Sequence, residues 1–277
     1  MLTLRTDYER MYENIVQAAR QYLNDNRNLR SLVVGISGGV DSGIVTCLAY
    51  EALKEFSDVS LVGRSLPIET NTEQEILRGR GIGTNFCNDF EIKDLTEAYR
   101  NLYAIFVGEH PRKNDPSQEE KIRRGNLKAR VRMAYLFDLA HFTKGMVLST
   151  DNYTELMLGF WTLHGDVGNY GLVQYLWKTE LYGLARFLAE KYERKGQSEK
   201  AEALRQCIDA VPTDGLGITG SDFDQIGVTD YESADLLLIE YLKGNTEKSH
   251  HPTIQKYLGS TYKRLDPQNI SREDIFK

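Results

Sequence analysis

A turn rich in glycine and serine carries the clearest chemical signal in this sequence. It lies between a short apolar run and an apolar helical stretch, and it reads Gly35-Ile36-Ser37-Gly38-Gly39-Val40-Asp41-Ser42-Gly43. Glycines at the entry to a helix let backbone amides converge at the positive end of the helix dipole, a geometry that binds phosphate. The turn has neither the Walker A lysine nor the glycine spacing of GxGxxG, so those two nucleotide-binding patterns are excluded.

The turn resembles the SGGxDS loop of the N-type ATP pyrophosphatases, enzymes that cleave ATP between its α and β phosphates. Ser37 and Ser42 can donate hydrogen bonds to the β and γ phosphates, and Asp41 offers a carboxylate oxygen to a bridging magnesium ion (Mg2+). A tight turn in which Asp41 only caps the next helix is the alternative. The resemblance implies an ATP site formed by Gly35, Ile36, Ser37, Gly38, Gly39, Val40, Asp41 and Ser42.

Two later segments resemble ammonia-dependent NAD synthetases in particular. Residues 125–133, GNLKARVRM, resemble the pattern GNxxARxRM, and residues 149–160, STDNYTELMLGF, resemble GTxNxxExxxGF. Asn126, Arg130 and Met133 are three to four residues apart and so share a helix face. The resemblance implies that this face binds nucleotide, with Arg130 on ATP and Asn126 on the second substrate. Arg132 is the weaker candidate, because a basic run of this kind is also typical of a solvated helix face.

Polar side chains also follow the last predicted strand. Thr150 and Asp151 come directly after it, and Glu155 lies one helical turn beyond Asp151, at the sheet edge where ligands bind. The resemblance implies that Thr150 binds ATP and that Glu155 is the second magnesium ligand beside Asp41. A helix-capping Asp151 and an exposed Glu155 are the alternatives.

The middle of the chain departs from the family pattern. Gly165-Asp166 resembles a GDG turn in which Val167 replaces the second glycine, and residues 176–179, LWKT, resemble LYKT. The resemblance implies that Asp166 binds the second substrate and that Lys178 binds the phosphates of ATP. Because ammonia must be neutral to attack, a carboxylate such as Asp166 is also a candidate proton acceptor.

The C-terminal matches are weaker still. Residues 212–216, PTDGL, resemble a PTADL lid, which makes Thr213 a candidate ATP ligand, and residues 262–264, YKR, stand where the family has HKR. The resemblance implies that Lys263 binds the second substrate. Solvated loops and a packing helix are the alternatives for this part of the chain.

The implied reaction is the ATP-dependent amidation of deamido-NAD by ammonia, through an acyl-adenylate, with release of AMP and pyrophosphate. Its catalytic residues would be Asp41, Glu155, Asp166 and Lys178, and its cofactor would be Mg2+. The first strand begins near Ser31, which leaves no room before it for a glutamine amidase domain, so we expect free ammonia unless another chain supplies it. Another ATP-pyrophosphatase amidotransferase, a tRNA-modifying enzyme and a catalytically silent nucleotide-binding protein remain alternatives.

The elements that must position these residues alternate between strand and helix. Apolar runs predict strands over 31–36, 59–66, 86–92 and 146–150, and helical spacing predicts helices over 8–23, 43–56, 72–80, 94–106 and 117–142. Such alternation is typical of an α/β fold with a doubly wound parallel sheet, which is Rossmann-like, with additional C-terminal helices. We expect one domain over 1–277, with an N-terminal helix in 1–28, a lid loop over 209–229 and a C-terminal tail over 246–277.

Composition limits the partners. The net charge of −6 is spread along the chain without a basic tract, so we expect no nucleic acid. No apolar stretch is long enough to span a bilayer and the N-terminus lacks a signal peptide's apolar core, so we expect a cytoplasmic protein that does not bind membranes. Three widely spaced cysteines predict buried thiols rather than disulfides or a zinc site. The resemblance also implies a homodimer.

Overall fold

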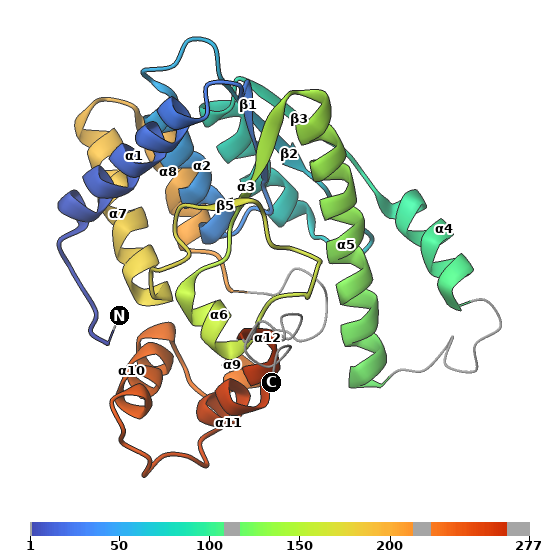
Figure 1. The fold of residues 1–277 in the computed structure, drawn as a ribbon, viewed down its shortest axis with the longest axis vertical. Coiled ribbons are helices and arrows are strands. Elements are labelled where there is room, and N and C mark those ends of the chain that lie inside the picture. The colour runs from blue at the N-terminus through green and yellow to red at the C-terminus, as the bar shows by residue number, and fades with distance from the viewer. Residues whose placement is uncertain (1, 108–116, 213–222, 265–277) are drawn as a thin grey trace, which may run out of the picture.

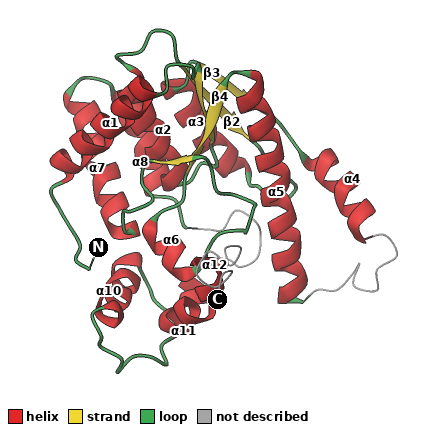
Figure 2. Ribbon diagram, in the orientation of Figure 1, coloured by secondary structure: helices red, strands yellow, loops and turns green. Residues whose placement is uncertain are grey.

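The computed structural model describes residues 2–107, 117–212 and 223–264. Its centre is a five-stranded parallel sheet in the order β3-β2-β1-β4-β5 (Figures 1 and 2). The elements are α1 (Tyr8–Asp25), β1 (Ser31–Gly35), α2 (Val40–Leu53), β2 (Ser60–Ser65), α3 (Glu73–Phe86), β3 (Asp89–Ile92), α4 (Thr96–Val107), α5 (Gln118–Phe142), β4 (Gly145–Ser149), α6 (Tyr153–Leu158), β5 (Tyr170–Gly171), α7 (Lys178–Arg194), α8 (Ser198–Ile208), α9 (Phe223–Ile226), α10 (Tyr231–Leu242), α11 (Pro252–Gly259) and α12 (Thr261–Arg264).

Helices cover both faces of the sheet because successive strand side chains alternate between them. Leu32 and Val34 of β1 belong to the core cluster formed with α1, α2, α7 and α8, whereas Val33 between them packs with α4 and α5. Figure 1 shows these two groups of helices on opposite sides of the strands. The predicted doubly wound α/β fold is confirmed.

Helix α2 is buried on nearly all sides and lies at the centre of the larger core. Twelve of its fourteen residues are buried, and it contacts α1, α3, α7 and α8. A helix that is apolar all round is expected inside a protein rather than on its surface. Since α2 begins at the phosphate-binding turn, a buried helix supports that turn.

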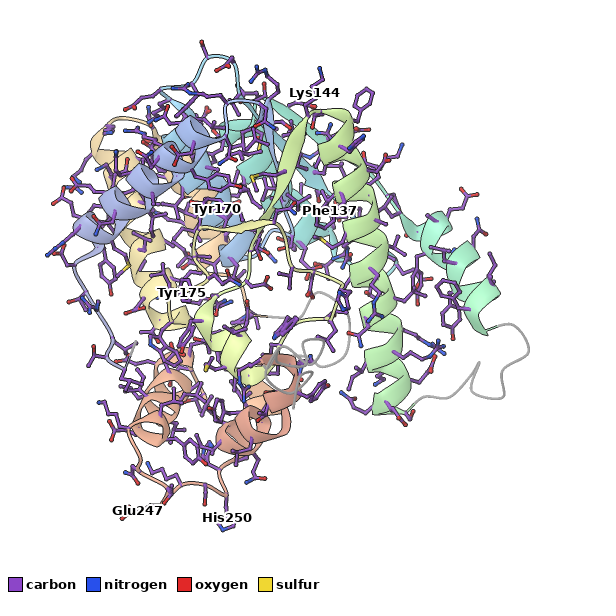
Figure 3. The ribbon with its side chains drawn as sticks, viewed as in Figure 1. Phe137, Lys144, Tyr170, Tyr175, Glu247 and His250 are labelled. Carbon is purple, nitrogen blue, oxygen red and sulfur yellow. The ribbon has the colours of Figure 1, made fainter. Side chains whose placement is uncertain are left out.

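The C-terminal helices form a further layer beyond the carboxyl edge of the sheet. A third core cluster joins α6 and Trp177 to α9, α10 and α11. Lys144, just before β4, and Glu247 and His250, between α10 and α11, lie at opposite ends of the molecule (Figure 3). The segment predicted as a tail from residue 246 contains helices α11 and α12 in its described part, and Ile254 of α11 is fully buried in this layer.

Several predicted bounds were wrong. Helix α2 starts at Val40 rather than 43, α3 continues to Phe86, and β3 begins only at Asp89. The short strand β5 was missed, since two residues are too few for a periodic pattern. Cys47 and Cys207 are buried thiols as expected, but Cys87 is only partly buried. Within the described ranges, the helices are all too short or too polar to cross a membrane.

A buried carboxylate joins three helices behind the sheet. Glu51 of α2 is 4% exposed and accepts hydrogen bonds from the hydroxyls of Tyr12 in α1 and Tyr192 in α7, each at 3.0 Å, and from Lys54 Nζ at 2.7 Å. Burial alone would raise the pKa of Glu51, but the bonds from Lys54, Tyr12 and Tyr192 outweigh it and hold the pKa below its ordinary value. The ionised carboxylate is therefore part of the folded structure.

We expect Glu51→Ala to lower the free energy of unfolding by about 3 kcal/mol, because the buried hydroxyl of Tyr192 and the partly buried hydroxyl of Tyr12 lose their acceptor. A lowered pKa means that the stabilisation is present above the unfolded pKa and is lost as pH falls through the folded one. The difference between wild type and Glu51→Gln should accordingly shrink below about pH 4. Urea unfolding across pH measures this, with Glu55→Ala as control, since the Glu55 side chain is 62% exposed. Equal losses in the two alanine variants would contradict the role of Glu51.

Candidate active site

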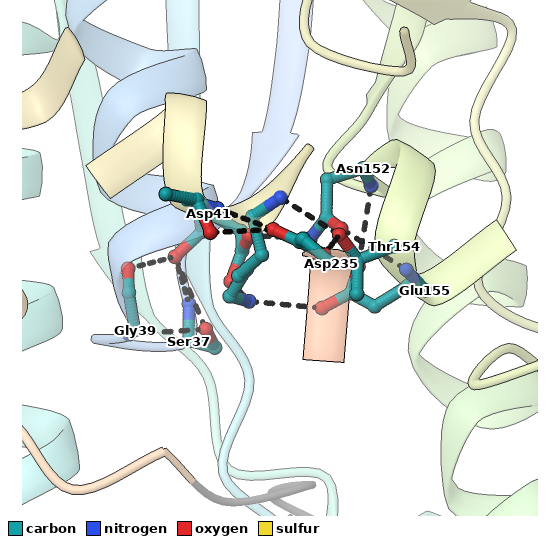
Figure 4. A network of polar contacts seen from close by, with 10 residues as sticks. Ser37, Gly39, Asp41, Asn152, Thr154, Glu155 and Asp235 are labelled. Carbon is teal, nitrogen blue, oxygen red and sulfur yellow. Dashed lines mark hydrogen bonds and ion pairs between the residues drawn. The ribbon is translucent and has the colours of Figure 1, made fainter. Parts of the chain in front are cut away.

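The phosphate-binding turn is held in shape by its own hydroxyls. Ser42 Oγ accepts from Ser37 N at 3.2 Å and donates to Gly39 O at 3.1 Å, and Gly39 N donates to Ser37 Oγ at 3.2 Å (Figure 4). Gly38 has φ +86°, and a Cβ there would lie 2.2 Å from the carbonyl oxygen of Glu75 in α3. Only glycine fits this position without moving α3. The turn therefore presents backbone amides from a fixed frame.

Asp41 lies in the first turn of α2 and meets two residues from distant segments. Its Oδ1 accepts from Asn152 Nδ2 at 2.8 Å, and its Oδ2 accepts from Lys178 Nζ at 2.6 Å. Asn152 follows β4 and Lys178 begins α7. The carboxyl ends of β1 and β4 are neighbours in the sheet, which is why residues more than 100 positions apart meet here.

Glu155 has two functions in this arrangement. Its Oε2 accepts from Asn152 N at 3.2 Å and its N–H donates to Asn152 Oδ1 at 3.1 Å, which is a capping box at the start of α6. Its Oε1 accepts from Lys178 Nζ at 3.0 Å. The helix cap thus turns one carboxylate oxygen toward the lysine. Asn152, rather than Asp151, is the cap of this helix.

Lys178 is the cation on which the two carboxylates converge (Figure 4). The residue is only 3% exposed. Burial by itself would lower the pKa of the ammonium group, but Asp41 and Glu155 outweigh this effect and raise the pKa well above its ordinary value. Lys178 therefore stays charged, and its Nζ lies 5.1 Å from the ring centroid of Tyr231, a favourable cation–π distance.

Glu155 and two further acids, Asp151 and Asp166, are affected by burial in this region. Burial raises the pKa of Glu155, and it raises the pKa of Asp151 to about 7 against the opposing hydrogen bond from Ser149 Oγ. Burial likewise raises the pKa of Asp166, whose Oδ1 accepts from Thr162 N at 2.8 Å. Buried carboxylates with raised pKa values favour either a bound cation or a proton.

A cavity of about 280 Å³ opens beside these groups. Most predicted ATP and catalytic residues line it, namely Gly35, Ile36, Ser37, Gly39, Val40, Asp41, Thr150, Glu155, Asp166 and Lys178. Gly38 and Ser42 belong to the frame of the turn instead. Thr213 lies outside the described residues. Within them, no group of three or more His, Cys, Asp or Glu side chains is arranged to hold a metal ion by itself.

Three predicted ligands do not line this cavity but bond to one loop, residues 159–166. Arg130 is exposed and its Nη2 donates to Leu163 O at 3.0 Å, and Asn126 Oδ1 accepts from Thr162 Oγ1 at 2.8 Å. Lys263 Nζ donates to Gly159 O at 2.6 Å and to Trp161 O. The loop they hold carries Asp166.

The cavity is also lined by Arg132, the weaker candidate of the α5 motif, and by two cations that the motifs did not single out. Arg132 of α5 lines it, with Nε donating to Leu66 O at 2.9 Å and Nη2 to Asn71 Oδ1 at 2.8 Å, and burial lowers its pKa to about 10. Arg64 and Arg78 line it too. Arg132 shares a helical face with the apolar residues Ala129 and Leu136. This apolar spacing is the sequence signal that would have favoured Arg132 over Arg130, because it indicates that the face is buried.

A carboxylate from the C-terminal layer supports the site from behind. Asp235 of α10 is fully buried and accepts from Thr154 Oγ1 at 2.5 Å and from Thr179 N and Oγ1 at 2.9 and 2.6 Å. Thr154 Oγ1 in turn accepts from Lys178 N at 2.8 Å. Asp235 therefore joins the first turns of α6 and α7, which carry Glu155 and Lys178.

Asp235→Ala should reduce turnover about tenfold and the free energy of unfolding by about 2–3 kcal/mol, since three donors lose their acceptor. The substrate KM values should change less than kcat, because Asp235 positions Lys178 without lining the cavity. Steady-state kinetics and urea unfolding measure both effects, and Glu232→Ala, on an exposed position of the same helix, is the control. A loss of stability with unchanged kcat would show that Asp235 has no part in positioning the site.

Comparison with known proteins agrees with this geometry. The family model described as NAD synthase matches residues 11–267. The NH(3)-dependent NAD(+) synthetase of Chlorobium phaeobacteroides is 32% identical over 251 residues, which cover 90% of this chain and 80% of that protein. The NH(3)-dependent NAD(+) synthetase of Methanocaldococcus jannaschii is 28% identical over 244 residues, which cover 86% of this chain and 85% of that protein.

Solved structures show the same fold at lower identity. An NMN synthetase from Francisella tularensis has a TM-score of 0.76 at 20% identity, covering 96% of this chain and 100% of its own. An NH3-dependent NAD synthetase from Campylobacter jejuni has a TM-score of 0.66 at 19% identity, with the same coverage of both chains. Since the family match runs from α1 through the phosphate-binding turn, the Glu155 helix and the C-terminal layer, the chain belongs to the NAD synthase family.

Proposed function

We propose that this protein, a ligase that forms carbon–nitrogen bonds, joins ammonia to the nicotinate carboxylate of deamido-NAD at the expense of ATP. The observation that carries the proposal is the Lys178 ammonium held by Asp41 and Glu155 beside the phosphate-binding turn, in a chain that matches the NAD synthase family. A carboxylate oxygen of deamido-NAD forms a bond to the α-phosphorus of ATP, while the bond between the α-phosphorus and the pyrophosphate oxygen breaks. Ammonia then bonds to the acyl carbon, AMP leaves, and one proton is released.

The phosphate-binding turn suits the first of these steps. Pyrophosphate gains charge as it leaves, and donors fixed in advance stabilise that charge without reorganising. The amides at the start of α2 and the hydroxyl of Ser37, which lines the cavity, are such donors, while the hydroxyl of Ser42 holds the turn in shape. The ammonium group of Lys178 stays protonated between Asp41 and Glu155, so it adds a positive charge throughout the step.

The residues present fit a magnesium ion bound together with ATP. Asp41 and Glu155 offer hard carboxylate oxygens that already converge on one cation, Lys178 Nζ, and Mg2+ is commonly held by one or two carboxylates plus substrate phosphates. We propose that these two carboxylates are its protein ligands. When bound, Mg2+ would neutralise charge on the phosphate oxygens.

Asp166 is the proposed proton acceptor for ammonium. Ammonium is the main form of ammonia near neutral pH and must lose a proton before its nitrogen can attack. Burial raises the pKa of Asp166, so its carboxylate accepts a proton more readily than an exposed aspartate. We further propose that Asn126, Arg130 and Lys263 act on the second substrate or on ATP through the loop 159–166 that they hold, and that Thr150 and Thr213 contact ATP.

The direct test is an assay for AMP and pyrophosphate with ATP, Mg2+, ammonium and a series of carboxylates. Deamido-NAD should give equimolar AMP, pyrophosphate and NAD, and omission of ammonium should stop NAD formation. Nicotinate mononucleotide belongs in the series, because the solved structure with a TM-score of 0.76 is that of an NMN synthetase. A catalytically silent binding protein would release neither product, and a tRNA-modifying enzyme would require tRNA for release.

The proposal includes a homodimer in the cytoplasm. Helix α4 exposes Ile105 at 73% and Phe106 at 61%; large apolar side chains exposed next to each other are typical of a surface covered by a partner. Light scattering should give twice the chain mass of 31.6 kDa.

A single catalytic unit over 1–277, with a lid within 209–229, is also proposed, since Asp235 of the C-terminal layer supports the site.

A further inference from the structure

Helix α3 lies directly against the phosphate-binding turn. A Cβ on Gly79 would be 3.2 Å from Ile36 O, and the backbone of Gly38 is in close contact with Glu75 O. From the same turn of α3, Arg78 Nε donates a hydrogen bond to Gly38 O at 2.9 Å. A guanidinium group is therefore bonded to the turn itself, on a helix to which neither the sequence motifs nor the family resemblance gave a ligand.

The charge of Arg78 is not neutralised by a neighbouring acid. In the described ranges 2–107, 117–212 and 223–264, no carboxylate oxygen lies within ion-pair distance of its guanidinium, whereas Arg64 is paired with Asp89 at 2.8 Å. Glu75, one turn earlier in α3, uses its Oε2 to accept from Thr72 N at 2.8 Å in a capping box. With Nε on Gly38 O, the two terminal nitrogens of Arg78 keep their donors for another acceptor.

Arg78 lines the cavity together with the turn and with residues 210–212. The other cation at the turn, Lys178, is already bonded to the carboxyl groups of Asp41 and Glu155. Arg132, also in the cavity wall, is bonded to Leu66 O and Asn71 Oδ1 at the end of β2 instead. Arg78 is thus a cavity-lining guanidinium that is bonded to the turn itself.

We infer that Arg78 binds the β and γ phosphates of ATP and stabilises the departing pyrophosphate. The inference rests on the proposed function for the identity of the leaving group. A guanidinium presents its donors in a planar fork that matches phosphate oxygens, and charge-assisted hydrogen bonds of this kind are the strong ones. No covalent bond of Arg78 forms or breaks. The bond between the α-phosphorus and the pyrophosphate oxygen breaks, its electron pair stays on pyrophosphate, and the guanidinium stabilises that negative charge.

Two variants distinguish phosphate binding by Arg78 from a purely structural role, in which Arg78 only supports Gly38. Arg78→Gln keeps an N–H donor for Gly38 O but removes the charge, whereas Arg78→Lys keeps a charge but loses the fork. The matched control is Arg80→Gln, two residues further along the same helix and exposed.

The experiment measures binding of pyrophosphate and of AMP by calorimetry, and pyrophosphate release with ATP, deamido-NAD and ammonium. Arg78→Gln should weaken pyrophosphate binding and lower kcat about tenfold to a hundredfold, the size of one charge-assisted contact, and change AMP binding less than about twofold. Arg78→Lys should recover part of both losses, and Arg80→Gln should match wild type. Wild-type pyrophosphate binding and kcat in Arg78→Gln would overturn the inference.

Failure of the proposed function gives a separate result. If wild type released no pyrophosphate with any carboxylate, the proposed ligase activity would be wrong, while the calorimetric comparison of wild type with Arg78→Gln would still decide whether Arg78 binds pyrophosphate. Equal melting temperatures of the three variants would show that the changes are not caused by unfolding.

Discussion

Asp41→Asn should fold normally and lose adenylylation. The substitution keeps the shape of the side chain and an oxygen for Asn152 Nδ2, but it removes one of the two carboxylates that converge on Lys178. Loss of one preorganised electrostatic group typically lowers kcat by about 100- to 1000-fold, and here the proposed magnesium ligand is lost as well. Pyrophosphate release measures the effect.

The control for Asp41→Asn is Asp138→Asn, on an exposed position of α5, which should retain wild-type turnover. Thermal unfolding should give a cooperative transition for both variants, because Glu155 still neutralises Lys178 when Asp41 is replaced. Full turnover by Asp41→Asn would refute the role of Asp41 in holding magnesium.

Lys178→Met should lose both activity and stability. Without the ammonium group, the carboxylates of Asp41 and Glu155 face each other in a buried site, and removing one partner of a buried ion pair typically costs about 3–5 kcal/mol. Turnover should fall at least about a hundredfold, because a fixed positive charge beside the phosphates is lost. Urea unfolding and pyrophosphate release measure the two effects.

The loss of stability in Lys178→Met should depend on pH. Burial already raises the pKa of Glu155, and loss of Lys178 removes an interaction that opposes this rise. In wild type the folded pKa of Glu155 is already about 8, and in the variant it is higher still, so the folded variant keeps its proton to higher pH and the stability deficit should grow as pH rises above about 8.

Mg2+ provides a second readout for Lys178→Met. If the ammonium group and the metal use the same two carboxylates, Mg2+ alone should raise the melting temperature more in the variant than in wild type. Lys195→Met, at the exposed far end of α7, should behave as wild type. An identical response to Mg2+ in the variant and in wild type would show that the metal and the ammonium group do not share these ligands.

The sequence predicted strands β1 to β4 well, because the apolar runs that indicate strands are local features of the chain. Four apolar runs between helical stretches placed β1 to β4 within about three residues, which is the usual uncertainty of element boundaries. β5 could not be predicted in this way, since Tyr170 and Gly171 form a strand only by pairing with Leu148 and Ser149 of β4. That pairing depends on contacts between distant segments.

The candidate site was predictable where the residues follow strand ends. Asp41, Thr150 and Glu155 were placed together because β1 and β4 are parallel and their carboxyl ends meet at one edge. Side chains along α5 were harder to place. Asn126 and Met133 share a helical face but are seven positions, or about 10 Å, apart along the axis. One therefore contacts the loop 159–166 while the other lines the cavity.

By itself, the sequence determined the α/β architecture, the phosphate-binding turn and the acids at the strand ends, because periodicity, glycine placement and connection order act over short distances along the chain. Only the tertiary structure decided that Lys178 is the cation shared by Asp41 and Glu155, that Arg78 and Arg132 face the cavity, and that Asp235 supports the site. These contacts join segments up to 137 positions apart. Their geometry follows from how whole helices pack on the sheet, which no local pattern specifies.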